Sequence, residues 1–168
     1  MSYAHRSKKR SSPMKRLAIL LVLLLLPALA FATPYRVVQV HDGDTITVEP
    51  AEGGDRIRIR LYGIDCPEKN QPFGSLATTY VRKAVLYKPV DLEIKSKDRY
   101  RRTVAVVTLA HGVTLQELLL NMGLAWVYPQ YCKDCKFWVG VQNEAQKNRR
   151  GLWQDDDPVP PWTWRKQR

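Results

Sequence analysis

Acidic residues gather at two points of the sequence where turns are expected. Asp42 and Asp44 flank a single glycine, and Asp65 and Glu68 follow an alternating apolar and basic segment that contains Arg60. In a three-stranded meander, the end of the third strand can approach the beginning of the second. We therefore expect the two acidic groups to meet beside Arg60, where carboxylates repel one another unless they share a cation.

The chemistry open to such a cluster depends on the cation that it shares. Carboxylate oxygens with few histidines nearby suit Ca²⁺ or Mg²⁺ better than a transition metal. A divalent ion and an arginine stabilise negative charge developing on a phosphodiester, and a spare carboxylate can take a proton from water. A second basic element, Asp98–Arg102, falls on an expected turn and can close over the same phosphate. The pattern indicates phosphodiester hydrolysis.

Each of these features also has a purely structural interpretation. Asp-Gly is an ordinary hairpin sequence, and arginines that alternate along a strand, as Arg56, Arg58 and Arg60 do, usually face solvent. A turn such as Asp98–Arg102 is often no more than an exposed charged loop. Their joint order along the chain favours a site over these separate explanations.

The elements that must position these residues follow the order βββ-α-ββ-α-α. Apolar–polar alternation predicts strands, and apolar residues at helical spacing predict helices. The expected strands are Tyr35–Val40, Asp44–Val48, Arg56–Tyr62, Val90–Lys95 and Thr103–Leu109. The first expected helix is Ser75–Tyr87, with Leu76, Tyr80, Ala84 and Tyr87 on one face. A short second helix begins at a capping box, Thr114–Glu117, and ends at Gly123, and the third helix is Lys136–Arg150. This layout predicts an α+β, mainly β, OB-fold: a five-stranded Greek-key barrel with three helices.

The length and charge of the chain set its domain organisation. With 168 residues it suits one domain, and 26% charged and 45% hydrophobic residues argue against wholesale disorder. Residues 1–32 resemble a secretory signal peptide, with six basic residues, an apolar run and A-x-A spacing before a cleavage site after Ala32. The alternative is a retained membrane anchor, but the apolar part, residues 17–32, is shorter than the roughly 20 residues that span a bilayer. We therefore expect cleavage and export to the periplasm or medium without stable membrane insertion.

Removal of the signal leaves 136 residues, 21 basic and 16 acidic, with a net charge of +5. We expect a domain over residues 33–154 and a tail, rich in Pro, Trp and basic residues, over residues 155–168. Cys132 and Cys135 can form a local disulfide that leaves Cys66 free. The alternatives are free thiols, a thioredoxin-like redox pair or half of a zinc site.

At the residues described above, the chain resembles the staphylococcal nuclease (thermonuclease) family. The shared pattern runs over about residues 35–154 and comprises Asp42-Gly43-Asp44-Thr45, Arg60-Leu61-x-x-Ile64-Asp65-x-Pro67-Glu68, Asp98-x-Tyr100-x-Arg102, Gly123-Leu124-Ala125 and Glu144-Ala145…Gly151-Leu152-Trp153. Five motifs in the right order make the resemblance specific. It implies Ca²⁺-dependent hydrolysis of DNA and RNA at the 5′ P–O bond, leaving 3′-phosphates.

The resemblance also implies a role for particular residues. Carboxylates and one backbone carbonyl would hold Ca²⁺, with a further acid supporting them, and one glutamate and two arginines would carry out the chemistry. In this sequence the metal ligands are Asp44, Asp65 and the carbonyl of Cys66, the support is Asp42, the general base is Glu68, and the phosphate-binding arginines are Arg60 and Arg102.

Three tyrosines complete the implied site. Tyr100 would contact the terminal phosphate, and Tyr131 and Tyr128 would contact the sugar or base. Such aromatic contacts suit single-stranded nucleic acid bound without sequence preference. We expect the protein to be a monomer. The chain departs from the family pattern at Arg101, where a glycine is usual, and at Pro129, where a substrate-facing tyrosine is usual. The link Lys69–Gly74 is also shorter than in the type enzyme.

Two other classes of protein fit the same sequence. OB-folds often bind nucleic acid without cutting it, and an inactive relative would be expected to lose Arg60, Glu68 or Arg102, all of which are present. The second alternative is a protein-interaction module that docks through Trp162–Arg168. Salt-dependent binding to polyanions separates the two, because phosphate contacts weaken steeply as salt rises.

Overall fold

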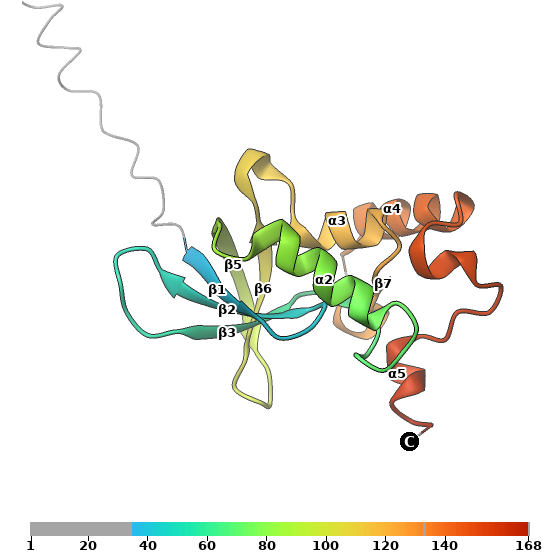
Figure 1. The fold of residues 1–168 in the computed structure, drawn as a ribbon, viewed down its shortest axis with the longest axis horizontal. Helices are drawn as coiled ribbons and strands as arrows, with labels where there is room; N and C mark the ends of the chain where they lie inside the picture. The colour runs from blue at the N-terminus through green and yellow to red at the C-terminus, as the bar shows by residue number, and fades with distance from the viewer. Residues whose placement is uncertain (1–34, 133, 168) are drawn as a thin grey trace, which may run out of the picture. The chain divides into compact units, whose positions relative to one another are not determined.

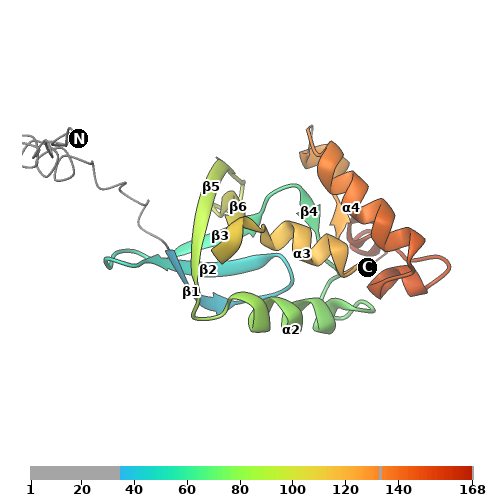
Figure 2. The ribbon, with the colours of Figure 1, turned by 90° about the horizontal axis from the view of Figure 1, so that it is seen from above.

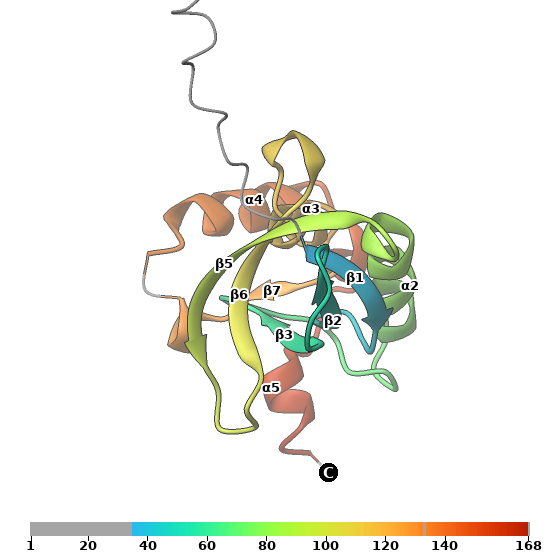
Figure 3. The same ribbon diagram turned by 90° about the vertical axis from the view of Figure 1, so that its left-hand side faces the viewer.

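The alternating residues of the N-terminal half form strands that close into a barrel (Figure 1). The computed structural model describes residues 35–132 and 134–167, so the expected signal peptide lies outside the described residues. The barrel strands are β1 (Tyr35–Val40), β2 (Thr45–Pro50), β3 (Ile57–Leu61), β5 (Pro89–Lys97) and β6 (Thr103–Thr108), in the order β1-β2-β3-β6-β5. Figure 3 shows them in turn around the barrel.

Two non-sequential pairings close the barrel. β3 pairs with β6 in parallel, with Ile59 opposite Thr103, whereas β1 pairs with β5 antiparallel, with Tyr35 opposite Val90. The antiparallel β1–β2–β3 meander and the β5–β6 hairpin supply the remaining pairs. This arrangement confirms the predicted five-stranded OB-fold barrel.

A second, two-stranded sheet was not expected from the sequence. β4 (Ile64–Asp65) pairs antiparallel with β7 (Trp126–Val127), so Ile64 lies opposite Val127 and Asp65 opposite Trp126. Strands this short carry no readable periodicity, which is why alternation could not reveal them. The pairing fixes the backbone of Asp65 directly after the barrel strand β3.

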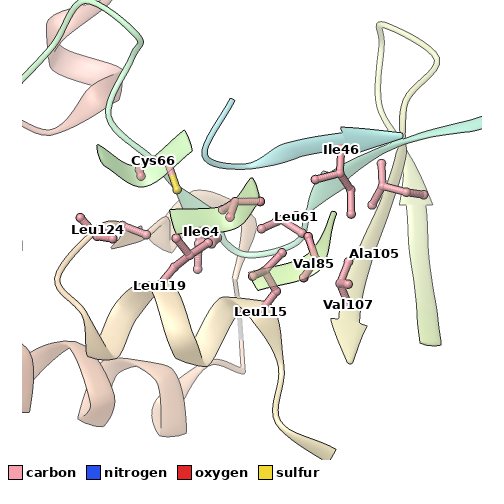
Figure 4. Packing of buried hydrophobic residues seen from close by; sticks show 14 of the residues in the cluster. Ile46, Leu61, Ile64, Cys66, Val85, Ala105, Val107, Leu115, Leu119 and Leu124 are labelled. Carbon is pink, nitrogen blue, oxygen red and sulfur yellow. The ribbon is translucent and has the colours of Figure 1, made fainter. Parts of the chain in front are cut away.

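The hydrophobic core fills the barrel and continues under α3 (Leu115–Asn121), as Figure 4 shows. Ile46, Leu61 and Val107 face inward from the strands, and Leu115 and Leu119 of α3 pack against them. The predicted capping box starts α3: Thr114 Oγ1 accepts a hydrogen bond from Glu117 N at 3.2 Å, and Glu117 Oε2 accepts one from Thr114 N at 2.7 Å.

The helix α2 (Gly74–Val85) lies along β1 (Figure 2), and its predicted buried face is only partly correct. Leu76 is 53% exposed and Tyr87 is 64% exposed. Tyr80 and Ala84 pack against the core as predicted, but the fully buried side chains are the smaller Ala77, Val81 and Val85. Small residues let the helix approach the barrel closely, so a pattern based on the largest apolar side chains missed the centre of the buried face.

The third helix, α4 (Lys136–Lys147), ends three residues earlier than predicted. Asn148 Nδ2 donates a hydrogen bond to the Glu144 carbonyl at 2.7 Å, and Arg149 leaves the helical region with φ 48°. The predicted inner face is correct: Ala145 is buried, and Trp138 and Val141 pack against the core. Just before α4, Cys132 and Cys135 form a disulfide, and Cys66 is free and buried.

The C-terminal segment, residues 155–167, folds back onto the domain and carries the short helix α5 (Pro161–Trp164). Short 3₁₀ turns at Ala110–Gly112, Pro129–Tyr131 and Gly151–Gln154 connect the other elements. Gln71 Nε2 donates a hydrogen bond to the Val159 carbonyl at 2.6 Å, and Pro161 is buried. Within the described ranges, no helix is both long enough and apolar enough to cross a membrane.

Candidate active site

All of the predicted site residues line one cleft beside the barrel. They come from the β1–β2 turn, the end of β3, the β3–α2 connection, the β5–β6 turn and the segment after β7. The cleft is lined by Asp42, Asp44, Arg60, Asp65, Cys66, Glu68, Tyr100, Arg102, Tyr128 and Tyr131.

Arg60 lies between two carboxylates of this cleft. Its Nη2 is 2.8 Å from Asp65 Oδ1 and 3.2 Å from Asp44 Oδ2. Its Nη1 donates hydrogen bonds to the carbonyls of Leu61, at 2.8 Å, and Ile64, at 2.9 Å. Four partners fix the guanidinium, which is only 14% exposed, so Arg60 presents a rigid positive charge to the cleft.

The carboxylate of Asp44 is held by the chain around it. Its Oδ2 accepts a hydrogen bond from Cys66 N at 2.9 Å, and its Oδ1 accepts one from Thr45 Oγ1 at 3.2 Å. Asp42 Oδ1 accepts a hydrogen bond from Asp44 N at 3.1 Å, which shapes the turn. A Cβ on Gly43 would lie 2.7 Å from Cys66 Cβ, so only glycine lets this turn approach Cys66 so closely.

The arginines neutralise only part of the negative charge of the aspartates in the cleft. Burial, followed by the negative charge of Asp44, raises the pKa of Asp65 to about 6, although a hydrogen bond from Arg165 and the charge of Arg60 oppose the rise. Burial and Asp44 also raise the pKa of Asp42. We call Asp42, Asp44, Asp65 and Glu68 the acidic cluster; further positive charge would stabilise its ionised form.

These residues fit a hard cation. Asp44 and Asp65 both direct an oxygen at Arg60 Nη2, so they converge on one region and offer the ligands that Ca²⁺ prefers. Burial raises the pKa of the Cys66 thiol well above its ordinary value, so its sulfur stays protonated and is a poor metal ligand. No three Asp, Glu, His or Cys side chains in the described ranges form a complete metal centre; a cation would need further oxygens from backbone, water or substrate.

The β5–β6 turn carries the second arginine. Asp98 Oδ2 accepts a hydrogen bond from Arg102 Nε at 2.7 Å, and Asp98 Oδ1 accepts bonds from the backbone N–H groups of Tyr100 and Arg102, both at 2.9 Å. Burial raises the pKa of Asp98, but these hydrogen bonds outweigh it and lower the pKa overall. Arg102 Nη1 lies 3.4 Å from Thr45 Oγ1, which brings this arginine to the start of β2.

Tyrosines lie at both sides of the cleft. Tyr100 is 65% exposed, and the guanidinium of Arg102 lies 5.5 Å from its ring centroid. On the other side, the rings of Tyr128 and Tyr131 meet edge-to-face at 4.8 Å, and Tyr131 is 59% exposed. Tyr100 and Tyr131 therefore offer ring surface to a ligand, and Tyr128 also lines the cleft.

The C-terminal segment contributes residues that the sequence analysis did not assign to the site. Trp162 stacks on Tyr128 at 4.9 Å with the ring planes 7° apart. Arg165 Nη1 lies 2.7 Å from Glu68 Oε1, and Arg165 Nη2 lies 2.8 Å from Asp65 Oδ2. The only available signal was the aromatic and basic composition of Trp162–Lys166, which does not show against which part of the domain this segment packs.

The fold and the cleft together define the class of protein. It is an OB-fold protein whose cleft brings paired carboxylates and two fixed arginines together as a candidate site for phosphate and a cation. The family described as Staphylococcal nuclease homologue matches residues 58–155. An "Uncharacterized endonuclease" of Escherichia coli O157:H7 is 40% identical over 151 residues, which cover 90% of this chain and 97% of that protein.

Two further relatives agree with this match. An "Uncharacterized endonuclease" of Haemophilus influenzae is 41% identical over 79% of this chain and 72% of its own. A "Micrococcal nuclease" of Shigella flexneri is 36% identical over 77% of this chain and 79% of its own. The chain therefore belongs to the staphylococcal nuclease family.

Proposed function

We propose that this protein is an exported, Ca²⁺-dependent nuclease that hydrolyses phosphodiester bonds of DNA and RNA at the 5′ P–O bond and leaves 3′-phosphates. The observation that carries the proposal is the convergence of Arg60, Glu68 and Arg102 with two aspartates in one cleft. Membership of the staphylococcal nuclease family supports the same reaction. Export rests on the signal-like sequence of residues 1–32.

Glu68 is the general base of the proposed reaction. It follows the short strand β4 and stands at the cleft, and the same guanidinium nitrogen, Arg165 Nη1, contacts Glu68 Oε1 at 2.7 Å and Asp65 Oδ1 at 3.4 Å. The two carboxylates therefore lie close together. A carboxylate in this position can take the proton from a water that attacks a phosphorus atom beside Asp65.

Arg60 and Arg102 stabilise the negative charge that develops on the phosphoryl oxygens. Both are oriented before substrate arrives, Arg60 by two backbone carbonyls and Arg102 by Asp98. Preorganised donors of this kind need no rearrangement during the reaction, which makes their charge effective. The planar guanidinium of Arg102, which Asp98 holds through Nε, also matches the spacing of phosphate oxygens.

Asp44 and Asp65, with the backbone carbonyl of Cys66, hold Ca²⁺ in the proposed enzyme, and Asp42 supports Asp44 through its backbone N–H. The bound ion supplies positive charge beside the reacting phosphate. The tyrosines at the two sides of the cleft, Tyr100 and the pair Tyr128 and Tyr131, bind the terminal phosphate and the sugar or base. Aromatic surfaces accept any base, so we propose single-stranded substrates without sequence preference, bound by a monomer.

The test is cleavage of single-stranded DNA and RNA by the purified protein, with Ca²⁺ or with a chelator. Calcium-dependent cleavage that leaves 3′-phosphate ends is the expected result. A folded protein that binds nucleic acid in a salt-dependent manner but does not cut it would instead be a non-catalytic OB-fold module. A protein that neither cuts nor binds would point to protein interaction.

A further inference from the structure

The C-terminal segment places a third arginine on the acidic cluster. Arg165 contacts Glu68 Oε1 at 2.7 Å and Asp65 Oδ2 at 2.8 Å, and its Nη1 also approaches Asp65 Oδ1 at 3.4 Å. Burial lowers the pKa of Arg165, but the hydrogen bonds and charges of Asp65 and Glu68 together outweigh it and raise the pKa overall. One guanidinium thus bridges an expected metal ligand and the proposed general base.

Contacts on the N-terminal side of Arg165 hold it in this position. The Val159 carbonyl accepts the hydrogen bond from Gln71, Pro161 is buried, and the ring of Trp162 stacks on Tyr128 and meets Trp126 edge-on at 6.5 Å. These contacts, and the hydrogen bond that the Arg165 backbone N–H donates to the Pro161 carbonyl at 3.0 Å, do not involve the Arg165 guanidinium. The side chain of Arg165 can therefore leave Asp65 without unseating the segment.

Asp65 has both of its oxygens engaged by arginines. Arg60 Nη2 contacts Oδ1, and Arg165 Nη2 contacts Oδ2, each at 2.8 Å. A metal ion that binds through Asp65 competes with both arginines for its lone pairs and for its negative charge. Arg60 is held by two backbone carbonyls and is 14% exposed, whereas the side chain of Arg165 is 43% exposed. Among the described residues, the Arg165 guanidinium donates hydrogen bonds only to Asp65 and Glu68. Arg165 is the arginine that gives way.

We propose that Arg165 is the resident counter-ion of Asp65 and Glu68, that a divalent cation displaces it, and that Arg165 thereby sets the calcium affinity of the site. The inference rests on the proposed function for its cation and extends it to a segment outside the family match. Its consequence for the reaction concerns Glu68: Oε1 is engaged while Arg165 stays in place, and it becomes free to accept a proton when the cation takes over the neutralisation of Asp65.

The test is direct calcium titration of the full chain by calorimetry, without nucleic acid. Arg165→Gln keeps a long polar side chain and removes the charge. We expect it to bind Ca²⁺ about tenfold more tightly, because the loss of one charge-assisted hydrogen-bonded pair is worth about that factor. Arg165→Lys keeps the competing charge and should restore an affinity close to that of the wild type.

Lys166→Gln is the matched control. It removes one positive charge at the next position, and Lys166 forms no ion pair with any residue in the described ranges. A clearly smaller effect than that of Arg165→Gln supports direct competition at Asp65. An equal effect would reduce the role of Arg165 to general electrostatics and overturn the proposal.

Unchanged or weaker calcium binding by Arg165→Gln would also overturn it, including the case in which neither the variant nor the wild type binds Ca²⁺. Binding by the variant alone would support it strongly. These outcomes are distinct from failure of the proposed function, which is judged by whether the wild type cleaves DNA or RNA. If the wild type cuts with Ca²⁺ and Arg165→Gln has the same calcium affinity as the wild type, the proposed function stands and only this inference is wrong.

Discussion

At the scale of single residues, the site is a chain of alternating charges. Asp44 and Asp65 share Arg60, and Asp65 and Glu68 share Arg165. Asp65 is the shared member, and its carboxylate is only 2% exposed. Burying a carboxylate is costly unless it is paired, so the arginines make it possible to keep this acid at the base of the cleft.

Glu68→Gln tests the general base. The amide has nearly the same shape as the carboxylate but cannot take a proton at neutral pH, so we expect turnover to fall by about 10²–10⁴-fold. Calcium binding should persist, because Asp44 and Asp65 remain. The measurement is kcat on a single-stranded substrate beside a calcium titration. The control is Glu52→Gln, an exposed glutamate outside the cleft; wild-type turnover in Glu68→Gln would refute the assignment.

Arg60→Lys tests the rigid arginine. An ammonium group cannot reach two carbonyls and two carboxylates at once, so the positive charge loses its fixed position. We expect kcat to fall by about 10²–10³-fold, as when one charge-stabilising donor is removed. Arg58→Lys, an exposed arginine on the same strand, should leave kcat unchanged. Circular dichroism checks folding, and a normal kcat for Arg60→Lys would remove it from the reaction.

At the scale of secondary structure, turns and short strands decide where the reacting groups stand. Asp44 lies in the β1–β2 turn, Asp65 ends the two-residue strand β4, and Arg102 closes the β5–β6 turn. In the β5–β6 turn, Arg101 stands where the family pattern usually has glycine. Arg101 adopts a left-handed backbone with φ 62°, which an L-residue with a side chain adopts only at a cost.

Arg101→Gly should therefore stabilise the protein. Glycine adopts the left-handed backbone without strain, but it also has more conformational entropy to lose on folding. Because the first effect is larger, we expect the free energy of unfolding to rise by about 0.5–1 kcal/mol. Urea denaturation measures it as a higher midpoint at constant slope. Arg99→Gly, in the same turn but without a positive φ, should be neutral or destabilising. A lower midpoint for Arg101→Gly would show that its side chain contributes more than its backbone costs.

The sequence predicted the barrel well because its strands carry strong local signals. Period-two alternation in residues 56–62 and the capping box at Thr114 act over a few residues, and the structure contains both elements. The sequence also predicted that the acidic cluster would form, since strand order alone places the end of β3 beside the start of β2. The β4–β7 sheet, the buried face of α2 and the position of Arg165 depend on contacts between distant segments, which no local pattern encodes.

At the scale of the whole molecule, the barrel and the C-terminal segment have separate tasks. The barrel with its connections holds all the groups proposed to react, from Asp42 to Arg102, whereas the C-terminal segment forms one wall of the cleft with Trp162 and neutralises the acids with Arg165. The segment is joined to the site through Gln71, Tyr128 and Glu68. Its loss should thus change stability and calcium response more than the reaction itself.

Deletion of residues 158–168 separates these tasks. Loss of the Trp162 stack and the buried Pro161 should lower the free energy of unfolding by about 2–4 kcal/mol, the range for losing a large packed side chain. At saturating Ca²⁺, kcat should stay close to that of the full chain, and less calcium should suffice for half-maximal cleavage because Arg165 no longer competes. A chain ending at Gln167 keeps all these contacts and should match the wild type in both stability and calcium response. If the longer deletion folds but loses most of its kcat at saturating Ca²⁺, the C-terminal segment takes part in the reaction directly.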